Sequence, residues 1–157
     1  MNRVRIPELD TPFLFGSRPE SLPGDLRPMW RIAAVLLILG IASRGKKSSF
    51  GRLHVLNWAI RTEETRAALK SLIRGGATPE TVVVRIEPSL NRAVDLASAE
   101  GFLQRVSGDR VQLTGLGSKR VEALLKSRAL EVERLFLKEI GTSLTEARVK
   151  SIFSGNI

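Results

Sequence analysis

The fold of this chain is decided by residues 88–114, which read PSLNRAVDLASAEGFLQRVSGDRVQLT. In its first half, apolar residues recur at the spacing of one helical face, and Gly101 is a typical helix stop. Two short apolar runs follow, separated by the turn-forming residues 107–110. The second run, 111–114, alternates apolar and polar side chains as a strand does. The stretch therefore predicts a helix, a β-hairpin and, from about Gly117, another helix.

Upstream of this stretch, the sequence predicts three helices and one strand. Residues 28–43 begin with a proline, a favoured first-turn residue, and are apolar on nearly every side, so we expect them at the centre of the core. A basic loop over 44–49 leads to a second helix over 49–61, and Thr62 is the N-cap of a third. Residues 82–87, VVVRIE, are rich in β-branched side chains and predict a strand.

Downstream of the hairpin, the apolar spacing predicts one long amphipathic helix over residues 117–140. Gly141 breaks the pattern, and a short last helix is expected from about Thr145 to Phe153. The predicted fold class is therefore mainly α with a small antiparallel β-hairpin, an α+β fold. Its expected parts are a proline-rich N-terminal arm over 1–27, a core over 28–125 and a C-terminal helical extension over 126–157.

The arm contains three large apolar residues, Phe13, Leu14 and Phe15, between prolines that prevent a long helix. Such side chains are expected to be buried, since leaving them in water forfeits the free energy of burial. Two sites of burial stay open. They pack on their own domain, or they bind a partner protein.

Composition limits the kinds of protein that this chain can be. Lys and Arg number 25 against 16 Asp and Glu, and the formal charge of +9 favours a polyanionic partner. Without cysteine the chain has no disulfide and no thiolate metal ligand. The N-terminus lacks the pattern of a signal peptide, and the longest apolar stretch, 32–42, is about half of a membrane span. We expect a cytoplasmic protein that does not contact membranes.

Candidate catalytic motifs are weak. Residues 40–47, GIASRGKK, fall short of a phosphate-binding P-loop because Lys47 stands where magnesium needs a hydroxyl ligand, and we interpret them as a basic turn after a helix. His54 is the single histidine and lies inside a predicted helix, which is typical of a structural residue. It has no cysteine to share a zinc site and no nucleophile presented at a sharp turn. The sequence predicts no enzyme, no cofactor and no metal.

Two resemblances narrow the class. The sequence AEGFLQRV…VQLTGLG over residues 99–117 is similar to the pattern of bacterial winged-helix domains, in which a helix and a hairpin are followed by Leu-Thr-Gly. A wider span, from RPMWR at 27–31 through LHVLNW at 53–58 to LNRAVDL at 90–96, resembles the small middle subunit of bacterial three-component ABC-ATPase systems related to Lamassu-type antiphage defence. That family implies an adaptor between an ATPase of the SMC or Rad50 kind and an effector subunit.

Basic and polar residues of the loop, the helix and the hairpin form a candidate nucleic-acid surface. In a DNA-reading winged helix, the helix before the hairpin enters the major groove. Here Glu87, Asp95 and Glu100 lie on or beside that helix and would repel phosphates, so we expect weak binding to the DNA backbone without sequence preference. The candidate residues are Arg44, Lys46, Lys47, Arg52, Asn91, Arg92, Arg105 and Arg110.

Two functions remain open on this basis. The first is a non-enzymatic winged-helix adaptor subunit that bridges an SMC/Rad50-like ATPase and an effector in antiphage defence, with auxiliary affinity for DNA. The alternative is a DNA-binding transcriptional regulator. A large ATPase gene beside this one would favour the first function.

Overall fold

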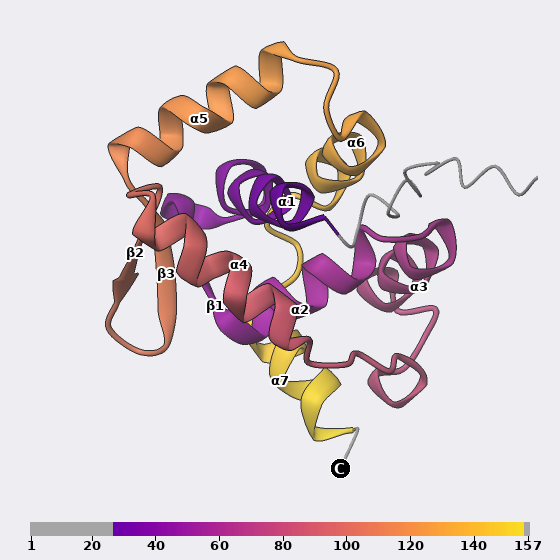
Figure 1. Cartoon of the computed structure of the whole chain (residues 1–157). Coiled ribbons are helices and arrows are strands. Elements are labelled where there is room, and N and C mark those ends of the chain that lie inside the picture. Colours follow the sequence, from indigo (N-terminus) through magenta and orange to yellow (C-terminus); the bar gives the residue numbers. More distant parts are fainter. Residues whose placement is uncertain (1–26, 156–157) are drawn as a thin grey trace, which may run out of the picture.

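The apolar helix α1 (Pro28–Ile41) lies at the centre of the molecule, as its sequence predicts (Figure 1). The computed structural model describes residues 27–155, and in it the side chains of residues 34–39 are almost completely buried. Burial of a large apolar side chain contributes about 1.5–3 kcal/mol, so this helix is a main source of stability. The helices that pack on it are α2 (Phe50–Ala59), α4 (Pro88–Ala99), α5 (Gly115–Lys126) and α6 (Glu131–Ile140).

A three-stranded antiparallel sheet flanks the helices and confirms the predicted α+β class. Its strands are β1 (Lys47–Ser49), β2 (Leu103–Val106) and β3 (Arg110–Leu113), in the order β1-β3-β2. The predicted hairpin is confirmed as β2 and β3. Its turn holds Gly108 and Asp109 at positive φ, a conformation that glycine and aspartate tolerate better than most residues.

β1 was expected to be part of a loop, and this prediction is wrong. Its three residues, Lys-Ser-Ser, have no strand signal of their own. The strand exists because β3 offers it backbone partners, with Ser48 opposite Val111. Both of these side chains are buried, which fixes the register of the pair.

The strand predicted over residues 82–87 is also absent. This segment connects the single turn η4 (Pro79–Thr81) to α4, and no other strand lies beside it in the described part of the chain. Over residues 82–84 the side chains still alternate, because Val82 and Val84 are buried while Val83 is exposed. Ile86 is also exposed and ends this alternation. The β-branched pattern therefore marks an extended segment that packs on the core without joining the sheet.

The long helix predicted over 117–140 is two helices, α5 and α6. Leu130 adopts a left-handed backbone conformation with φ 50° between them, and α6 then turns back along α1. Arg134 stabilises the break, since its Nη1 donates to the carbonyl oxygens of Leu124, Leu125 and Ser127 at 2.9–3.1 Å. A basic side chain of the second helix thus satisfies carbonyl groups at the end of the first.

The C-terminal extension is part of the same core as the preceding residues. Phe136, Leu137 and Ile140 are buried on α6, and Val149 and Ile152 are buried on α7 (Glu146–Ser154). This last helix packs on α2, and Arg148 donates to carbonyl oxygens at the end of α3 (Glu63–Arg74). Within residues 27–155, none of the helices combines the length and the apolar character that crossing a bilayer requires.

Candidate nucleic-acid interface

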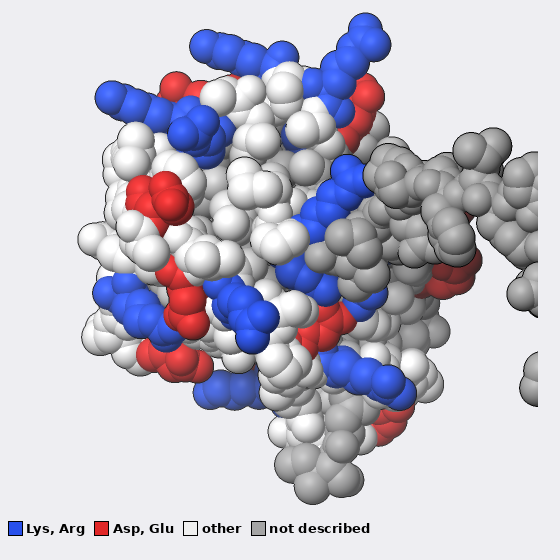
Figure 2. All heavy atoms as spheres, in the orientation of Figure 1, with Lys and Arg blue, Asp and Glu red and all other residues white. Residues whose placement is uncertain are grey.

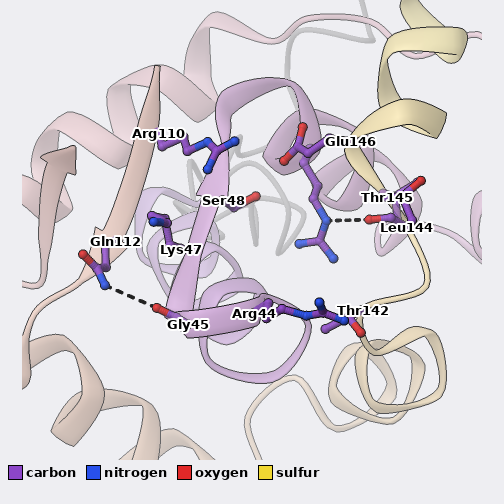
Figure 3. Close-up of a pocket in the computed structure, with 11 residues that line it drawn as sticks. Arg44, Gly45, Lys47, Ser48, Arg110, Gln112, Thr142, Leu144, Thr145 and Glu146 are labelled. Atoms are coloured by element: carbon purple, nitrogen blue, oxygen red, sulfur yellow. Dashed lines mark hydrogen bonds between the residues drawn. The ribbon is translucent and has the colours of Figure 1, made fainter. Parts of the chain in front are cut away.

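Three of the basic residues predicted to bind nucleic acid, Arg44, Lys47 and Arg110, line one pocket of about 580 Å³. Figure 3 shows Lys47, Arg110 and Gln112 on one side of this pocket and residues of the loop before α7 on the other. All three basic side chains are exposed to solvent. We call these three residues the basic triplet.

Strand pairing explains why the basic triplet converges. In the register of β1 and β3, Lys47 lies opposite Gln112 and Ser49 lies opposite Arg110. Neighbouring side chains of a strand point to opposite faces, so burial of Ser48 and Val111 leaves Lys47, Arg110 and Gln112 on the outer face. Arg44 belongs to the turn η3 (Arg44–Lys46), and Gln112 Nε2 holds this turn against β3 by donating to the Gly45 carbonyl oxygen at 3.3 Å.

Arg52 was expected on the exposed basic surface, and this expectation is wrong. The residue is only 6% exposed, and it lies on α2. Its Nε donates to Leu144 O at 2.8 Å, and its two Nη atoms donate to Ser43 Oγ at 2.9 Å and Ala42 O at 2.5 Å. Arg52 therefore joins the end of α1 to the loop before α7 and forms part of the pocket wall. Burial lowers the pKa of its guanidinium, and the nearby Glu146 opposes that shift.

The electrostatics of the pocket favour an anion. Four of its lining residues are cationic, the basic triplet and Arg52, whereas Glu146 is the one lining carboxylate. Glu146 accepts a hydrogen bond from Ser49 Oγ at 2.8 Å. Guanidinium and ammonium groups keep their charge at neutral pH and bind phosphate or carboxylate oxygens well. An anionic group of moderate size fits this chemistry.

Lys46 lies beside the pocket and does not line it. It has a positive φ of 54°, and its Nζ donates to Ser118 Oγ on α5 at 3.0 Å. The side chain is exposed, so this contact is a surface hydrogen bond. Lys46 extends the basic region from the sheet edge toward the first turn of α5.

The other predicted residues form a second group around α4 and the hairpin. Asn91 and Arg105 line a smaller hollow of about 440 Å³, together with Phe50 and His54. Arg105 donates to Asp95 Oδ1 at 2.7 Å, and its guanidinium carbon lies 5.1 Å from the centre of the Phe50 ring. Arg92 is exposed on α4 and lines neither hollow. The structure thus divides the predicted surface into two sites.

Two of the three carboxylates on or beside α4 are paired with arginines. Glu87 forms salt bridges with the buried Arg31, at 2.7 Å, and with Arg61. Asp95 is paired with Arg105. These pairs reduce the expected repulsion of phosphates, but they also occupy basic groups. Figure 2 shows this face, where positive and negative side chains are interspersed and no single positive patch covers α4.

His54 lies within α2, as its sequence predicts, and its side chain is buried. Its Nδ1 accepts a hydrogen bond from the backbone N–H of Glu87 at 3.4 Å, so the ring proton is assigned to Nε2, which lies 3.3 Å from Asn91 Oδ1. Burial lowers the pKa of His54, against the opposing effects of Asn91 and Glu87. Among the described residues, no group of three or more His, Cys, Asp or Glu side chains is arranged to hold a metal ion.

The near-P-loop sequence has a packing explanation. Gly40 lies within α1, and a Cβ at this position would come within 2.6 Å of Val121 Cγ1 on α5. The glycine therefore permits close approach of two helices, and the basic residues after it form η3 and the start of β1. No phosphate-binding loop joins a strand to a helix here.

Sequence reasoning missed Gln112, Thr142 and Glu146 as pocket residues. Gln112 could have been placed beside Lys47 only if the pairing of β1 with β3 had been anticipated. Thr142 and Glu146 lie on either side of Leu144, whose carbonyl oxygen accepts a hydrogen bond from Arg52, and this long-range contact leaves no local signal in the sequence. The candidate partner-binding residues Phe13, Leu14 and Phe15 lie outside the described residues.

Comparisons with protein-family models, curated proteins and solved structures found no match to this chain. The fold and the pocket define its class on their own, as an α+β protein with a basic surface pocket between a small sheet and its C-terminal helices.

Proposed function

We propose that this protein is a non-enzymatic adaptor with a winged-helix core, which binds the DNA backbone weakly through the basic triplet and holds its partners through protein contacts. The observation that carries the DNA-binding part is the convergence of Arg44, Lys47 and Arg110 on one pocket from three different elements. The resemblance to the middle subunits of three-component ABC-ATPase systems supplies the expected partners, an SMC/Rad50-like ATPase and an effector.

The order of elements supports the winged-helix interpretation. A helix, α1, precedes a short strand, β1, and helices then lead to the hairpin of β2 and β3. The sheet order β1-β3-β2 places the first strand beside the last, and α4 packs directly against β2. In this interpretation the hairpin is the wing, and α4 occupies the position of the helix that enters the major groove.

Charge pairing favours backbone contacts over base reading. Of the basic residues at α4 and the hairpin, Arg105 is held by Asp95, and Arg92 is the single Arg or Lys on α4 itself. Base recognition relies on several donor or acceptor side chains that can reach the groove edge. Contacts from the basic triplet to phosphates carry no sequence information, which agrees with an auxiliary role for DNA.

Exposed apolar side chains on α6 support the protein-binding part of the proposal. Val132 and Leu135 are three residues apart, so they share one face of the helix, and they are 56% and 63% exposed. Apolar side chains that lie together on a surface are typical of interaction sites. We assign a contact with a protein partner to this face.

The DNA-binding part is tested by fluorescence anisotropy with a short duplex of arbitrary sequence over a range of salt concentrations. Changing the basic triplet to Gln is expected to weaken binding to every duplex and to lower the salt slope by up to about three, near 0.9 for each lost phosphate contact. The matched control changes Lys126, Arg128 and Lys138 to Gln, which removes the same charge from exposed positions outside the pocket. Equal losses in both variants would disprove the role of the pocket.

A footprint on one defined operator that persists at moderate salt would overturn this proposal and favour the transcriptional regulator. The adaptor part is tested by affinity purification from the native host followed by mass spectrometry. We expect an ATPase with coiled-coil arms to be recovered by the wild-type chain and lost with a V132S/L135S variant. Recovery of the same ATPase by that variant would exclude the α6 face as its binding site.

A further inference from the structure

An apolar groove of about 500 Å³ is lined by residues of α1, α4 and α5. Most of its lining is apolar and includes Met29, Ile32, Leu96, Phe102 and Leu124, while Arg120 lies at its edge. Figure 2 shows this region as a largely uncharged area on the face between α5 and α4. We call it the α1–α4–α5 groove.

Two of the apolar side chains that line this groove are exposed to solvent. Met29 is 73% exposed and Leu96 is 44% exposed, and both line the same hollow. At the rim, the Arg120 guanidinium lies 5.2 Å from the centre of the Phe102 ring. A hollow of this size with an apolar lining is suited to a few large apolar side chains.

The groove lies at the start of the described structure, close to the N-terminal arm. The described structure starts at Arg27, and the next two residues, Pro28 and Met29, already line the groove. We propose that Phe13, Leu14 and Phe15 of the same chain dock into the α1–α4–α5 groove. These residues form the cluster of large apolar side chains in the 26 residues that precede the described structure.

The length of the connection permits this docking. Phe15 precedes Pro28 by 13 positions in the sequence, and an extended chain spans about 3.3–3.6 Å per residue, or roughly 45 Å in total. The cost of closing such a short loop is small, and the tether gives the segment a high effective concentration at the groove. A segment on another molecule has no such advantage.

Charges on either side of the apolar cluster complement the groove. Asp10 precedes Phe13 and Arg18 follows Phe15. The groove offers Arg120 on α5 and Glu100 beside α4 as oppositely charged partners. These exposed pairs contribute little energy, but they favour one direction of the docked segment over the other.

The proposal is tested by NMR on the full chain with one nitroxide label. Because the chain contains no cysteine, S17C provides a unique attachment point two residues after Phe15. We expect the label to broaden the amide signals of groove residues on α1, α4 and α5 while leaving α7 sharp. The additional changes F13S and F15S are expected to abolish this broadening. The control change V83S, at an exposed apolar position outside the groove, is expected to preserve it.

A second experiment mixes spin-labelled chains with ¹⁵N-labelled chains that carry no nitroxide. It distinguishes docking of the arm within its own chain from docking onto a second copy. Docking within one chain gives no broadening in the mixture at any concentration. Broadening in the mixture that grows with concentration would assign the groove to a second copy and overturn the proposal. Absence of groove broadening in the singly labelled chain, or broadening that survives F13S and F15S, would also overturn it.

Discussion

Arg52 offers the sharpest test of how the basic residues are divided between structure and binding. Its guanidinium is buried and donates to the backbone carbonyl oxygens of Ala42 and Leu144. An R52A variant leaves both oxygens without this partner, and each unsatisfied buried group costs about 1–3 kcal/mol. We therefore expect the free energy of unfolding to fall by about 2–6 kcal/mol.

The assay is equilibrium unfolding in denaturant, followed by the fluorescence of the two tryptophans, Trp30 and Trp58. R44A and R110A serve as matched controls, since these arginines line the same pocket but are exposed, and each is expected to change stability by no more than about 0.5 kcal/mol. An R52A variant that unfolds at the wild-type midpoint would refute the structural role. If that variant also bound DNA more weakly, Arg52 would belong to the binding surface after all.

Three further predictions concern the core, the buried histidine and the arm. L37A, at the centre of α1, is expected to cost about 2–5 kcal/mol in the same unfolding assay, and an unchanged midpoint would contradict the central position of this helix. His54 has a lowered pKa in the folded state. Between this folded pKa and the ordinary histidine pKa of about 6.5, the unfolded chain binds more protons than the folded chain. The free energy of unfolding should therefore fall as the pH drops through about 6.5 toward the folded pKa. An H54Q variant should lack this pH dependence, and a variant that retains the full slope would show that other groups cause it. Deletion of residues 1–20 should lower the melting temperature by about 2–4 °C for each kcal/mol of lost docking energy. An unchanged melting temperature, with loss of a co-purifying partner, would instead place Phe13, Leu14 and Phe15 on a second chain.

The candidate site was predictable in part. Arg44, Lys47 and Arg110 were identified as basic residues of a loop and a hairpin, because surface charge is visible in a sequence. That these three line one pocket, whereas Asn91 and Arg105 line another, depends on the pairing of β1 with β3 and on the position of α4. The pairing of Asp95 with Arg105, which links α4 to the hairpin, was likewise invisible.

Several elements follow from local signals that can be recognised in the sequence. An almost wholly apolar composition, interrupted by Arg31, predicts α1 as the central helix. Thr62 and Thr145 cap the helices that follow them, as hydroxyl side chains do. Gly101 ends α4 in a left-handed conformation, and the Ser-Gly-Asp-Arg turn places β2 beside β3. For the caps and the turn, the atoms that stabilise the element lie within a few residues of one another along the chain.

Other features depend on partners that are distant along the chain and follow from the packing of the whole fold. A strand needs a neighbour to pair with, which β3 gives to Lys47–Ser49 and nothing in the described structure gives to residues 82–87. The break between α5 and α6 persists because α6 packs back on α1 and Arg134 satisfies the carbonyl groups at the end of α5. Arg52 is buried because the loop before α7 closes over it, 92 residues away along the chain from its carbonyl acceptor at Leu144. Hydrogen bonds and apolar burial across such separations are set by how the helices pack, and local sequence patterns carry no record of them.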